Sequence, residues 1–221
     1  MELKNKLLFK QECYIGGKWI NSANGETIEV DNPATQESIG VVPKCGAEET
    51  KIAIEAANSS WADWKARPAI ERSALLRKWF NLIESNHEDL AQIMTMEQGK
   101  PIAESRGEIT YGASFVEWFA EEAKRVYGDI IPDRLTDRRI VVIKQPVGVV
   151  CAITPWNFPS SMITRKCAPA LAVGCPVVIK PASQTPYSAL ALAVLAEEAG
   201  FPKGVINIIT GSAKEIGGEM T

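Results

Sequence analysis

The sequence has almost no histidine and no clustered cysteines, and both absences limit its chemistry. A single histidine, His87, stands among 221 residues, which argues against a histidine-rich metal site and a histidine-based catalytic triad. The five cysteines are scattered, odd in number and never spaced CxxC, so they suggest neither a zinc site nor a disulfide framework. We expect Cys151, Cys167 and Cys175 to be buried in apolar surroundings. We therefore expect no metal ion and a cytoplasmic location.

Strong charge of one sign and long apolar runs are also missing. A net charge of −3 gives no electrostatic reason to expect nucleic acid or an anionic membrane as a partner. No segment approaches the roughly 18 apolar residues of a membrane span, and the apolar residues 7–9 are too few for the core of a signal peptide. Hydrophobic residues make up 46% of the chain, which is enough for a sizeable core.

The first half of the chain predicts a small antiparallel part followed by helices. Residues 13–15 and 18–20 flank Gly16-Gly17 as in a tight hairpin. With a further strand at 27–30, we expect this hairpin to be an appendage apart from the parallel core. Apolar residues at helical spacing predict four helices, at 47–66, 68–84, 90–96 and 101 to about 126. The aromatic stripe of the last helix favours a core position: Tyr111, Phe115, Trp118 and Phe119.

The second half alternates strands and helices. Apolar strands at 147–153, 176–179 and 205–209 alternate with helices at 160–173 and 187–199. The second of these helices is expected to have Thr185 as its hydroxyl cap and Pro186 in its first turn. This β-α-β-α-β order predicts an α/β fold with a Rossmann-like parallel sheet and flanking helices.

The chain divides at an irregular stretch. Residues 127–145 contain the β-branched strand 139–144, and we expect an exposed hairpin that pairs with another subunit. The division is then a hairpin and helical part at 1–126, an oligomerisation hairpin at 127–145, and a cofactor-binding core at 146–221.

Polar residues gather where the predicted parallel strands end. These segments are 154–159, 180–183 and 210–212, and ligands bind at this edge of such sheets. The GxGxxG fingerprint of ordinary dinucleotide-binding folds is absent after the first strand, and Gly211, Gly217 and Gly218 have the wrong spacing. Phosphate groups must therefore be held in another way.

Two of these segments resemble a known family. The sequence ITPWNFP at 153–159, followed by KPAS at 180–183, resembles the aldehyde dehydrogenase superfamily. The segments EQGKP at 97–101 and PVGV at 146–149 fit the same family, and the match runs from about residue 12 to the C-terminus. Within the superfamily, the bacterial NADP-dependent succinate-semialdehyde dehydrogenases are the most similar, as judged from residues 115–122, 162–166 and 183–186.

The resemblance implies roles for individual residues. Asn157 matches an asparagine that donates to the developing oxyanion, which suits a fixed neutral donor. Lys180 matches the lysine that binds the adenosine ribose. Ser183 stands where NAD-preferring relatives often carry glutamate, so NADP is expected as the preferred cofactor and NAD as the second. Arg165 matches an arginine that binds a distal carboxylate of the substrate. The remaining residues expected at the cofactor are Ile153, Thr154, Trp156 and Gly211.

Each role has a structural alternative. Asn157 could cap the helix that begins near residue 160, and Lys180 could be a surface lysine at a strand end. Ser183 could provide polarity at a helix entry, Arg165 could form a salt bridge between helices, and Trp156 could belong to the core.

The family's chemistry needs two further groups. A cysteine thiolate attacks the aldehyde, hydride passes to the nicotinamide, and a glutamate assists hydrolysis of the thioester. In the family both residues lie downstream of the segments matched here. We expect this chain to lack the catalytic domain, to be inactive alone, and to leave a sheet edge and an apolar face uncovered. The full-length protein is expected to oxidise succinate semialdehyde to succinate as a homo-oligomer, a dimer or tetramer.

Two other hypotheses stay open. The chain could be a catalytically inactive module for cofactor binding or subunit interaction. It could also belong to an unrelated class of parallel α/β nucleotide-binding proteins, which the specificity of residues 154–159 and 180–183 disfavours.

Overall fold

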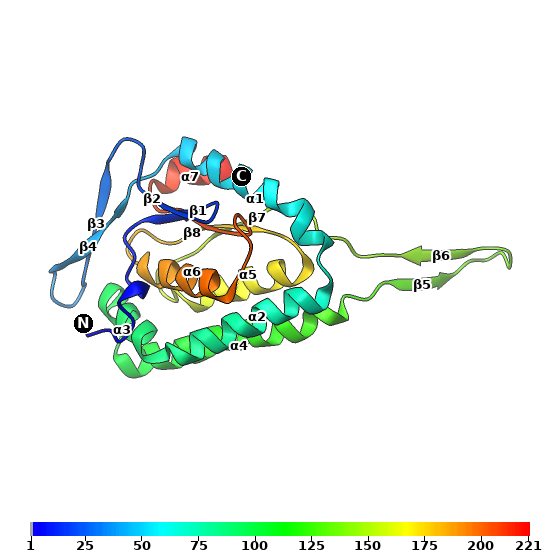
Figure 1. Cartoon of the computed structure of the whole chain (residues 1–221), viewed down its shortest axis with the longest axis horizontal. Helices are drawn as coiled ribbons and strands as arrows, with labels where there is room; N and C mark the ends of the chain where they lie inside the picture. The colour runs from blue at the N-terminus through cyan, green and yellow to red at the C-terminus, as the bar shows by residue number, and fades with distance from the viewer. Residues whose placement is uncertain (1) are drawn as a thin grey trace.

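The computed structural model describes residues 2–221, and a five-stranded mixed sheet in the order β2-β1-β9-β8-β7 forms its centre (Figure 1). Its parallel strands are β7 (Val150–Ile153), β8 (Val177–Lys180) and β9 (Ile206–Ile208). All residues of β8 and β9 are buried, as expected of strands covered on both faces. The predicted α/β fold with a Rossmann-like sheet is therefore confirmed. Among the described residues, β7 pairs only with β8 and leaves one edge open.

The N-terminal hairpin is part of this sheet, so the prediction of a separate appendage is wrong. Strand β1 (Cys13–Ile15) pairs with β2 (Lys18–Ile20) through a turn at Gly16-Gly17, whose φ angles are 60° and 74°. Its Tyr14 also pairs with Ile208 of β9 in antiparallel direction. The hairpin thereby covers the backbone donors and acceptors that β9 would otherwise leave unpaired at the sheet edge.

Buried Asn207 fastens the hairpin to the parallel strands. Its side-chain oxygen accepts a hydrogen bond from the Gly16 N–H at 2.9 Å. Its amide nitrogen donates to the carbonyls of Gly204 at 2.7 Å and Val177 at 3.2 Å. Asn207 is fully buried, and these three bonds meet the needs of its polar atoms.

Helices cover both faces of the sheet in layers (Figure 1). Helices α1 (Ala47–Ala66) and α7 (Ala213–Met220) lie together on one face, and α5 (Ser161–Val173) and α6 (Tyr187–Ala199) lie on the other. An outer layer of α2 (Ala69–Ser85), α3 (His87–Gln98) and α4 (Ile102–Glu122) packs on α5 and α6. These ranges agree with the predicted helices, except that α3 begins three residues earlier than the apolar pattern indicates and α4 ends at Glu122, before the predicted end near residue 126.

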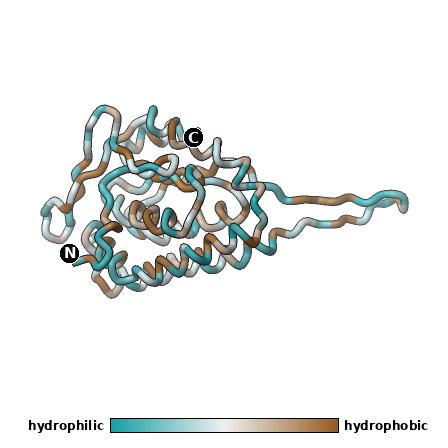
Figure 2. The backbone as a smooth tube through the Cα atoms, in the orientation of Figure 1, coloured by the Kyte–Doolittle hydropathy of each residue, from teal (hydrophilic) through white to brown (hydrophobic). Residues whose placement is uncertain are grey.

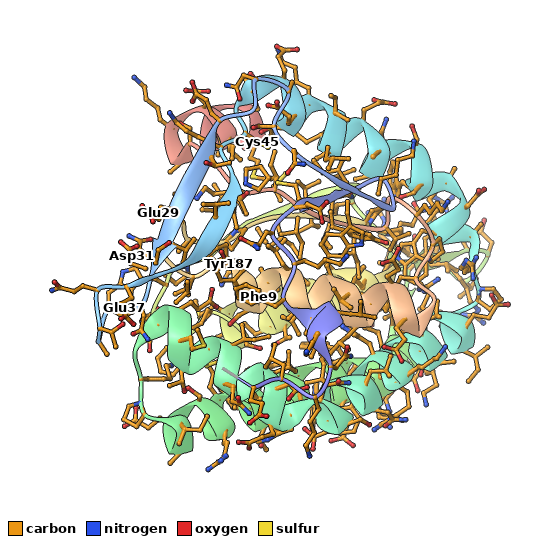
Figure 3. All side chains as sticks on the ribbon, turned by 60° about the vertical axis from the view of Figure 1, so that its left-hand side comes forward. Phe9, Glu29, Asp31, Glu37, Cys45 and Tyr187 are labelled. Carbon is orange, nitrogen blue, oxygen red and sulfur yellow. The ribbon has the colours of Figure 1, made fainter. Side chains whose placement is uncertain are left out.

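Several smaller elements complete the chain. Short 3-10 helices occur at Lys6–Leu8 (η1) and Ala123–Arg125 (η2). Strand β3 (Thr27–Asp31) pairs with β4 (Ser38–Pro43), a partner that the sequence pattern did not indicate. Phe9, just after η1, stacks on Tyr187 of α6 with ring centroids 4.4 Å apart (Figure 3).

A long hairpin projects from the body (Figure 1). It consists of β5 (Asp129–Pro132) and β6 (Arg139–Val142), and every residue of both strands is exposed. Its strands are nevertheless apolar (Figure 2), with Ile130 72% and Val141 66% exposed. The hairpin expected within 127–145 is present, and its role in oligomerisation stays a prediction.

Two predictions about side-chain burial need correction. The aromatic stripe of α4 is not a core stripe, because Tyr111 is 51% and Trp118 64% exposed. Cys167 and Cys175 are buried as expected, whereas Cys151 is only half-buried. Across residues 2–221, no helix has the length and apolar character needed to cross a membrane.

Candidate functional site

The carboxyl ends of β7 and β8 bring several predicted site residues together. Ile153 pairs with Lys180 in the parallel register, and the Thr154 N–H donates to the Lys180 carbonyl at 3.1 Å. Thr154 is buried, while Ile153 is 48% exposed. Gly217 of α7 lies close to the Ile153 side chain: a Cβ added at Gly217 would be 3.8 Å from the Cδ1 atom of Ile153.

Lys180 is a buried cation with donors to spare. It is only 3% exposed, so the alternative of a surface lysine is wrong. Its ammonium group donates to the Pro181 carbonyl at 2.9 Å, its one hydrogen bond within residues 2–221, although an ammonium group has three donors. Desolvation lowers the pKa of Lys180. A buried, underused cation of this kind suits a polar or anionic ligand.

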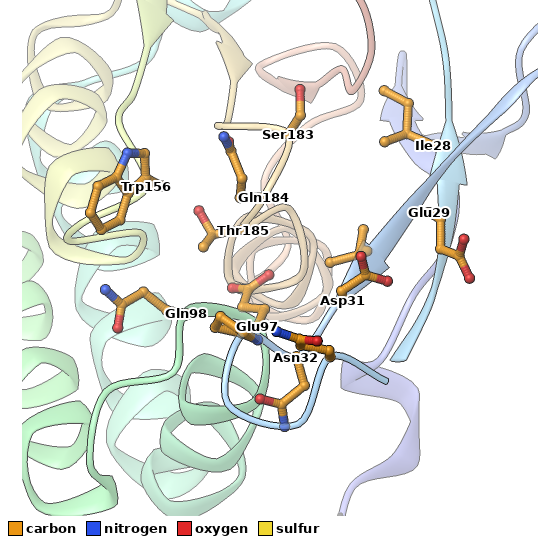
Figure 4. Close-up of a pocket in the computed structure, with 13 residues that line it drawn as sticks. Ile28, Glu29, Asp31, Asn32, Glu97, Gln98, Trp156, Ser183, Gln184 and Thr185 are labelled. Carbon is orange, nitrogen blue, oxygen red and sulfur yellow. The ribbon is translucent and has the colours of Figure 1, made fainter. Parts of the chain in front are cut away.

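An open cavity of about 610 Å³ lies beside these strand ends (Figure 4). Trp156 and Ser183 line it from the loops after β7 and β8. Trp156 is 54% exposed and is therefore not a core residue. Three acidic residues, Glu29, Asp31 and Glu97, also line the cavity. The Ser183 hydroxyl points away from Glu97 (Figure 4), so a phosphate bound to it would avoid this acidic side.

The Asn157 side chain is free to meet a ligand. Asn157 is exposed, and its side-chain amide makes no hydrogen bond to any residue that the structure describes. Its backbone carbonyl instead accepts from the Lys100 ammonium at 3.0 Å. The alternative that Asn157 caps α5 is wrong, because the first N–H groups of α5 donate to Glu108.

Buried carboxylates from other helices cap both α5 and α6. Glu108 of α4 accepts from the Ser160 and Ser161 N–H groups at 2.9 and 3.1 Å. Glu97 of α3 accepts from the Tyr187 and Ser188 N–H groups at 2.6 and 2.8 Å. The predicted cap Thr185 is wrong, since its buried hydroxyl has no partner within residues 2–221.

The Glu108 and Glu97 caps occupy the positions at the starts of α5 and α6 where a phosphate could otherwise bind. A helix N-terminus is an anion site because its N–H groups and dipole face the ligand. At α5 and α6 the protein's own carboxylates already hold these positions. The expectation that phosphates are held in another way than in ordinary dinucleotide-binding folds now has a physical reason, which sequence reasoning missed.

Arg165 lies on α5 with an aromatic neighbour and no acidic one. Its guanidinium carbon is 5.6 Å from the centre of the Phe115 ring, and its Nη1 lies 3.8 Å from the Met162 sulfur. Arg165 is exposed, and no salt bridge joins it to an acidic residue within the described chain. The alternative of a salt bridge between helices is therefore not observed.

Gly211 has a structural reason to be glycine. Its φ is 142°, and a Cβ at this position would overlap the backbone of Cys45. The Cys45 N–H donates to the Thr210 carbonyl, and the Ser212 N–H donates to the Cys45 carbonyl, each at 3.1 Å. The close approach of these two segments, at Cys45 and at residues 210–212, is sufficient to require glycine here. A role of Gly211 at a cofactor stays a prediction.

Four of the five cysteines are buried, and Cys151 is half-buried. Burial raises the pKa of Cys151, and it raises the pKa of Cys167 to about 12. Cys13 and Cys45 are buried with their sulfurs 3.7 Å apart. The hydrogen bond between them lowers the pKa of the Cys13 thiol and raises the pKa of the Cys45 thiol. Residues 2–221 also contain no group of three or more His, Cys, Asp or Glu side chains that could hold a metal ion.

The sheet, its helical layers and the underused cation at its carboxyl edge define a domain of the α/β nucleotide-binding class. The model of the aldehyde dehydrogenase family matches residues 19–221, and the chain belongs to this family. Within the described residues, no hydrogen bond joins the side chains of Asn157, Arg165, Lys180 and Ser183 to one another.

Named relatives and solved structures agree with this membership. The chain is 63% identical to glutarate-semialdehyde dehydrogenase of Pseudomonas aeruginosa and covers 46% of it. It is 58% identical to the NADP(+) succinate-semialdehyde dehydrogenase of Escherichia coli, again covering 46%. In both comparisons 100% of this chain is aligned. The chain thus spans about half the length of these curated relatives.

Solved structures share the fold closely. The crystal structure of succinate-semialdehyde dehydrogenase from Burkholderia pseudomallei superposes with a TM-score of 0.99 at 56% identity. The superposition covers 100% of this chain and 46% of that one. A crystal structure described as an Escherichia coli NADP-dependent enzyme gives a TM-score of 0.98 at 58% identity, covering 99% and 45% of the two chains.

Proposed function

We propose that the protein carrying this chain oxidises a small aldehyde with a distal carboxylate, with succinate semialdehyde as the first candidate. NADP is the preferred hydride acceptor in this proposal, and NAD is the second. The relatives described above are named as dehydrogenases of glutarate semialdehyde and succinate semialdehyde. The observation that carries the proposal is Lys180, a buried cation with unused donors at the ligand-binding edge of the sheet.

Six residues are proposed to hold the cofactor. Lys180 and Ser183 bind the adenosine ribose and its 2′-phosphate, because a lysine and a hydroxyl offer donors without the repulsion of a glutamate. Ile153 ends β7, Thr154 and Trp156 lie in the loop after it, and Gly211 belongs to the same proposal. When bound, the nicotinamide accepts the hydride. The protein's part is to orient the cofactor and to exclude water around it.

Asn157 and Arg165 are proposed to act on the substrate. The free Asn157 amide donates to the oxygen that gains negative charge when the aldehyde carbon is attacked. The Arg165 guanidinium binds the distal carboxylate through paired N–H donors. Its lack of an acidic partner supports this, since a carboxylate ligand then has no competitor. The neighbouring Phe115 ring gives the methylene groups of the substrate an apolar surface.

The nucleophile and the general base are proposed to lie in a part of the protein outside this chain. None of the five cysteines here combines exposure with a thiol that ionises easily. The 221-residue chain alone is therefore proposed to bind cofactor without oxidising aldehyde. An inactive module for cofactor binding is the alternative.

The proposal is tested by assaying the complete polypeptide and the 221-residue chain side by side. NADP-dependent oxidation of succinate semialdehyde is expected from the complete polypeptide and not from the 221-residue chain. Glutarate semialdehyde and an aldehyde without a carboxylate serve as comparison substrates. If the complete polypeptide binds NADP but oxidises none of them, the alternative of an inactive module replaces this proposal.

Assembly and compartment complete the proposal. The exposed apolar strands β5 and β6 are proposed to pair in a homo-oligomer, a dimer or tetramer. The five cysteines are all free thiols in the structure, which supports a cytoplasmic location.

A further inference from the structure

We propose that Lys100 and Glu108 are positioning residues that fix the Asn157 loop for catalysis. This inference rests on the proposed role of Asn157 as donor to the oxyanion. The loop between β7 and α5, residues 154–160, carries Asn157 on an exposed stretch. An exposed loop holds a donor in one place only if other groups restrain its backbone.

Lys100 restrains the middle of this loop. Its ammonium group donates to the Asn157 carbonyl at 3.0 Å and to the Glu108 carboxylate at 2.5 Å. The same ammonium lies 4.5 Å from the centre of the Phe158 ring, a favourable contact of a cation with an aromatic face. One side chain from the loop between α3 and α4 thus contacts two consecutive residues of the Asn157 loop.

Glu108 restrains the end of the loop. One carboxylate oxygen accepts from the ammonium of Lys100, and the other accepts from the N–H groups of Ser160 and Ser161. Lys100 and Glu108 therefore form one bridge whose two ends hold the backbone at Asn157 and at the start of α5. Between these two points the chain has only Phe158 and Pro159, so little freedom is left.

The bridge is shielded from solvent. The Glu108 side chain is 1% exposed and that of Lys100 is 10% exposed. Buried ion pairs add little net stability compared with apolar side chains of the same volume. Their directed hydrogen bonds do fix geometry, and loss of one partner leaves the other charge unpaired. Loss of Lys100 should consequently move the Asn157 loop more than it changes cofactor binding at Lys180.

The test uses Lys100→Met, Lys100→Arg and Glu108→Gln in the complete polypeptide. Arg106→Met is the matched control, because Arg106 lies on α4, the helix of Glu108, and makes an exposed ion pair with Glu88 of α3. A displacement of about 1 Å at a catalytic group costs on the order of 100-fold in rate. We therefore expect Lys100→Met and Glu108→Gln to lower kcat about 10- to 100-fold, with the KM for aldehyde and the Kd for NADP within about threefold of the parent. Lys100→Arg should restore most of kcat.

A double variant separates positioning from general loss of structure. Asn157→Ala alone should lower kcat about 100- to 1,000-fold, the usual loss for one oxyanion donor. If Lys100 acts through Asn157, adding Lys100→Met to Asn157→Ala should cost less than about threefold more. Fully additive losses would overturn the positioning role, as would a Lys100→Met variant with unchanged kcat.

Hydrogen exchange tests the same inference without activity. Amides of residues 157–164 should exchange faster in Lys100→Met than in the parent, and the Arg106→Met control should not change. Unchanged exchange in this segment would overturn the inference. Absence of aldehyde oxidation by the parent would overturn the proposed function and with it any catalytic purpose of the bridge, while faster exchange would still support the restraint of the loop. If Lys100→Met does not fold, Glu108→Gln carries the same measurements.

Discussion

Two buried ionisable residues, Lys180 and Glu97, stand on either side of the loop between β8 and α6. Lys180 precedes the loop and has unused donors, whereas Glu97 caps the helix that follows it with two short hydrogen bonds. Burial disfavours the charged form of both. The protein compensates Glu97 with its own N–H groups and leaves Lys180 for a ligand.

Lys180→Met is expected to weaken NADP binding about 10- to 100-fold, because hydrogen bonds to a charged donor contribute about 1.5–3 kcal/mol. Folding stability should not fall, since the variant removes a cation whose burial is unfavourable. Titration calorimetry and thermal unfolding measure the two effects. Lys78→Met, at an exposed position on α2, is the control. An unchanged Kd in Lys180→Met would contradict the placement of the ribose.

Glu97 gives the fold a pH dependence. Desolvation raises the pKa of Glu97 from 4.5 to about 8, although hydrogen bonds from Tyr187 and Ser188 oppose the shift. Between these values the folded chain retains a proton that the unfolded chain releases, so this group's contribution to the free energy of unfolding falls as pH rises. The contribution of Glu97 to the free energy of unfolding is complete at a pH below its pKa in the unfolded chain. It is lost at a pH above its pKa in the folded chain.

Glu97→Gln should remove this dependence. Urea unfolding is expected to show that the parent loses more stability than Glu97→Gln between about pH 5 and about pH 8. Glu84→Gln, at an exposed position of α2, should follow the parent. Parallel pH curves for the parent and Glu97→Gln would mean that the carboxyl is already ionised over this range.

At the scale of elements, the central sheet combines local and distant pairing. Strands β7, β8 and β9 and the helices between them follow one another in the chain, and their apolar patterns predicted them with boundaries close to those observed. The attachment of β1 to β9 was not predictable in this way, because Tyr14 and Ile208 are far apart in sequence and no local pattern records such pairing.

The site residues also differ in whether a local sequence pattern indicates them. Lys180 and Asn157 were predicted because they stand in motif segments at strand ends, and Arg165 because it stands in a motif segment of α5. Their roles stay predictions. Glu108 has no local signal, since its carboxylate acts on N–H groups 52 and 53 residues further along the chain. Thr185 illustrates the opposite error: a hydroxyl just before a helix usually caps it, but the carboxylate of Glu97 takes that place.

Asn207→Leu tests the link between hairpin and sheet. The variant leaves the Gly16 N–H and two carbonyls without their partner, and we expect a loss of about 2–4 kcal/mol in the free energy of unfolding. The Gly16 amide should exchange its hydrogen faster than in the parent. Asn58→Leu, exposed on α1, is expected to change neither value. Equal stability of Asn207→Leu and the parent would show that the hairpin does not depend on this side chain.

At the scale of the whole molecule, the projecting hairpin stands out because its two strands pack on each other and not on the body of the chain. All eight residues of β5 and β6 are exposed, and they include two isoleucines in β5 and one isoleucine and two valines in β6. Apolar strands with free edges tend to pair with other chains. The shape of the molecule in Figure 1 therefore supports an assembly in which other subunits cover this hairpin.

A double variant, Ile130→Asp with Val141→Asp, should reduce the size of the assembly measured by sedimentation velocity. The two positions pair across the hairpin, so the variant places two like charges side by side on a surface proposed to be apolar and buried. Ile52→Asp on α1, where Ile52 is 56% exposed, is the matched control and should leave the assembly unchanged. An assembly of the parent's size in the double variant would contradict the proposed interface.

The carboxylate caps also bear on the order in which the chain folds. Glu97 caps a helix 90 residues further along the chain, and Glu108 caps one 52 residues further along. During synthesis, Glu97 and Glu108 leave the ribosome before α5 and α6. The carboxyl groups that cap these two helices are therefore already present when the helices form. We therefore expect residues 146–221 to be less stable without the rest of the chain. Transplanted into another protein, they would carry four uncapped N–H groups at the starts of α5 and α6.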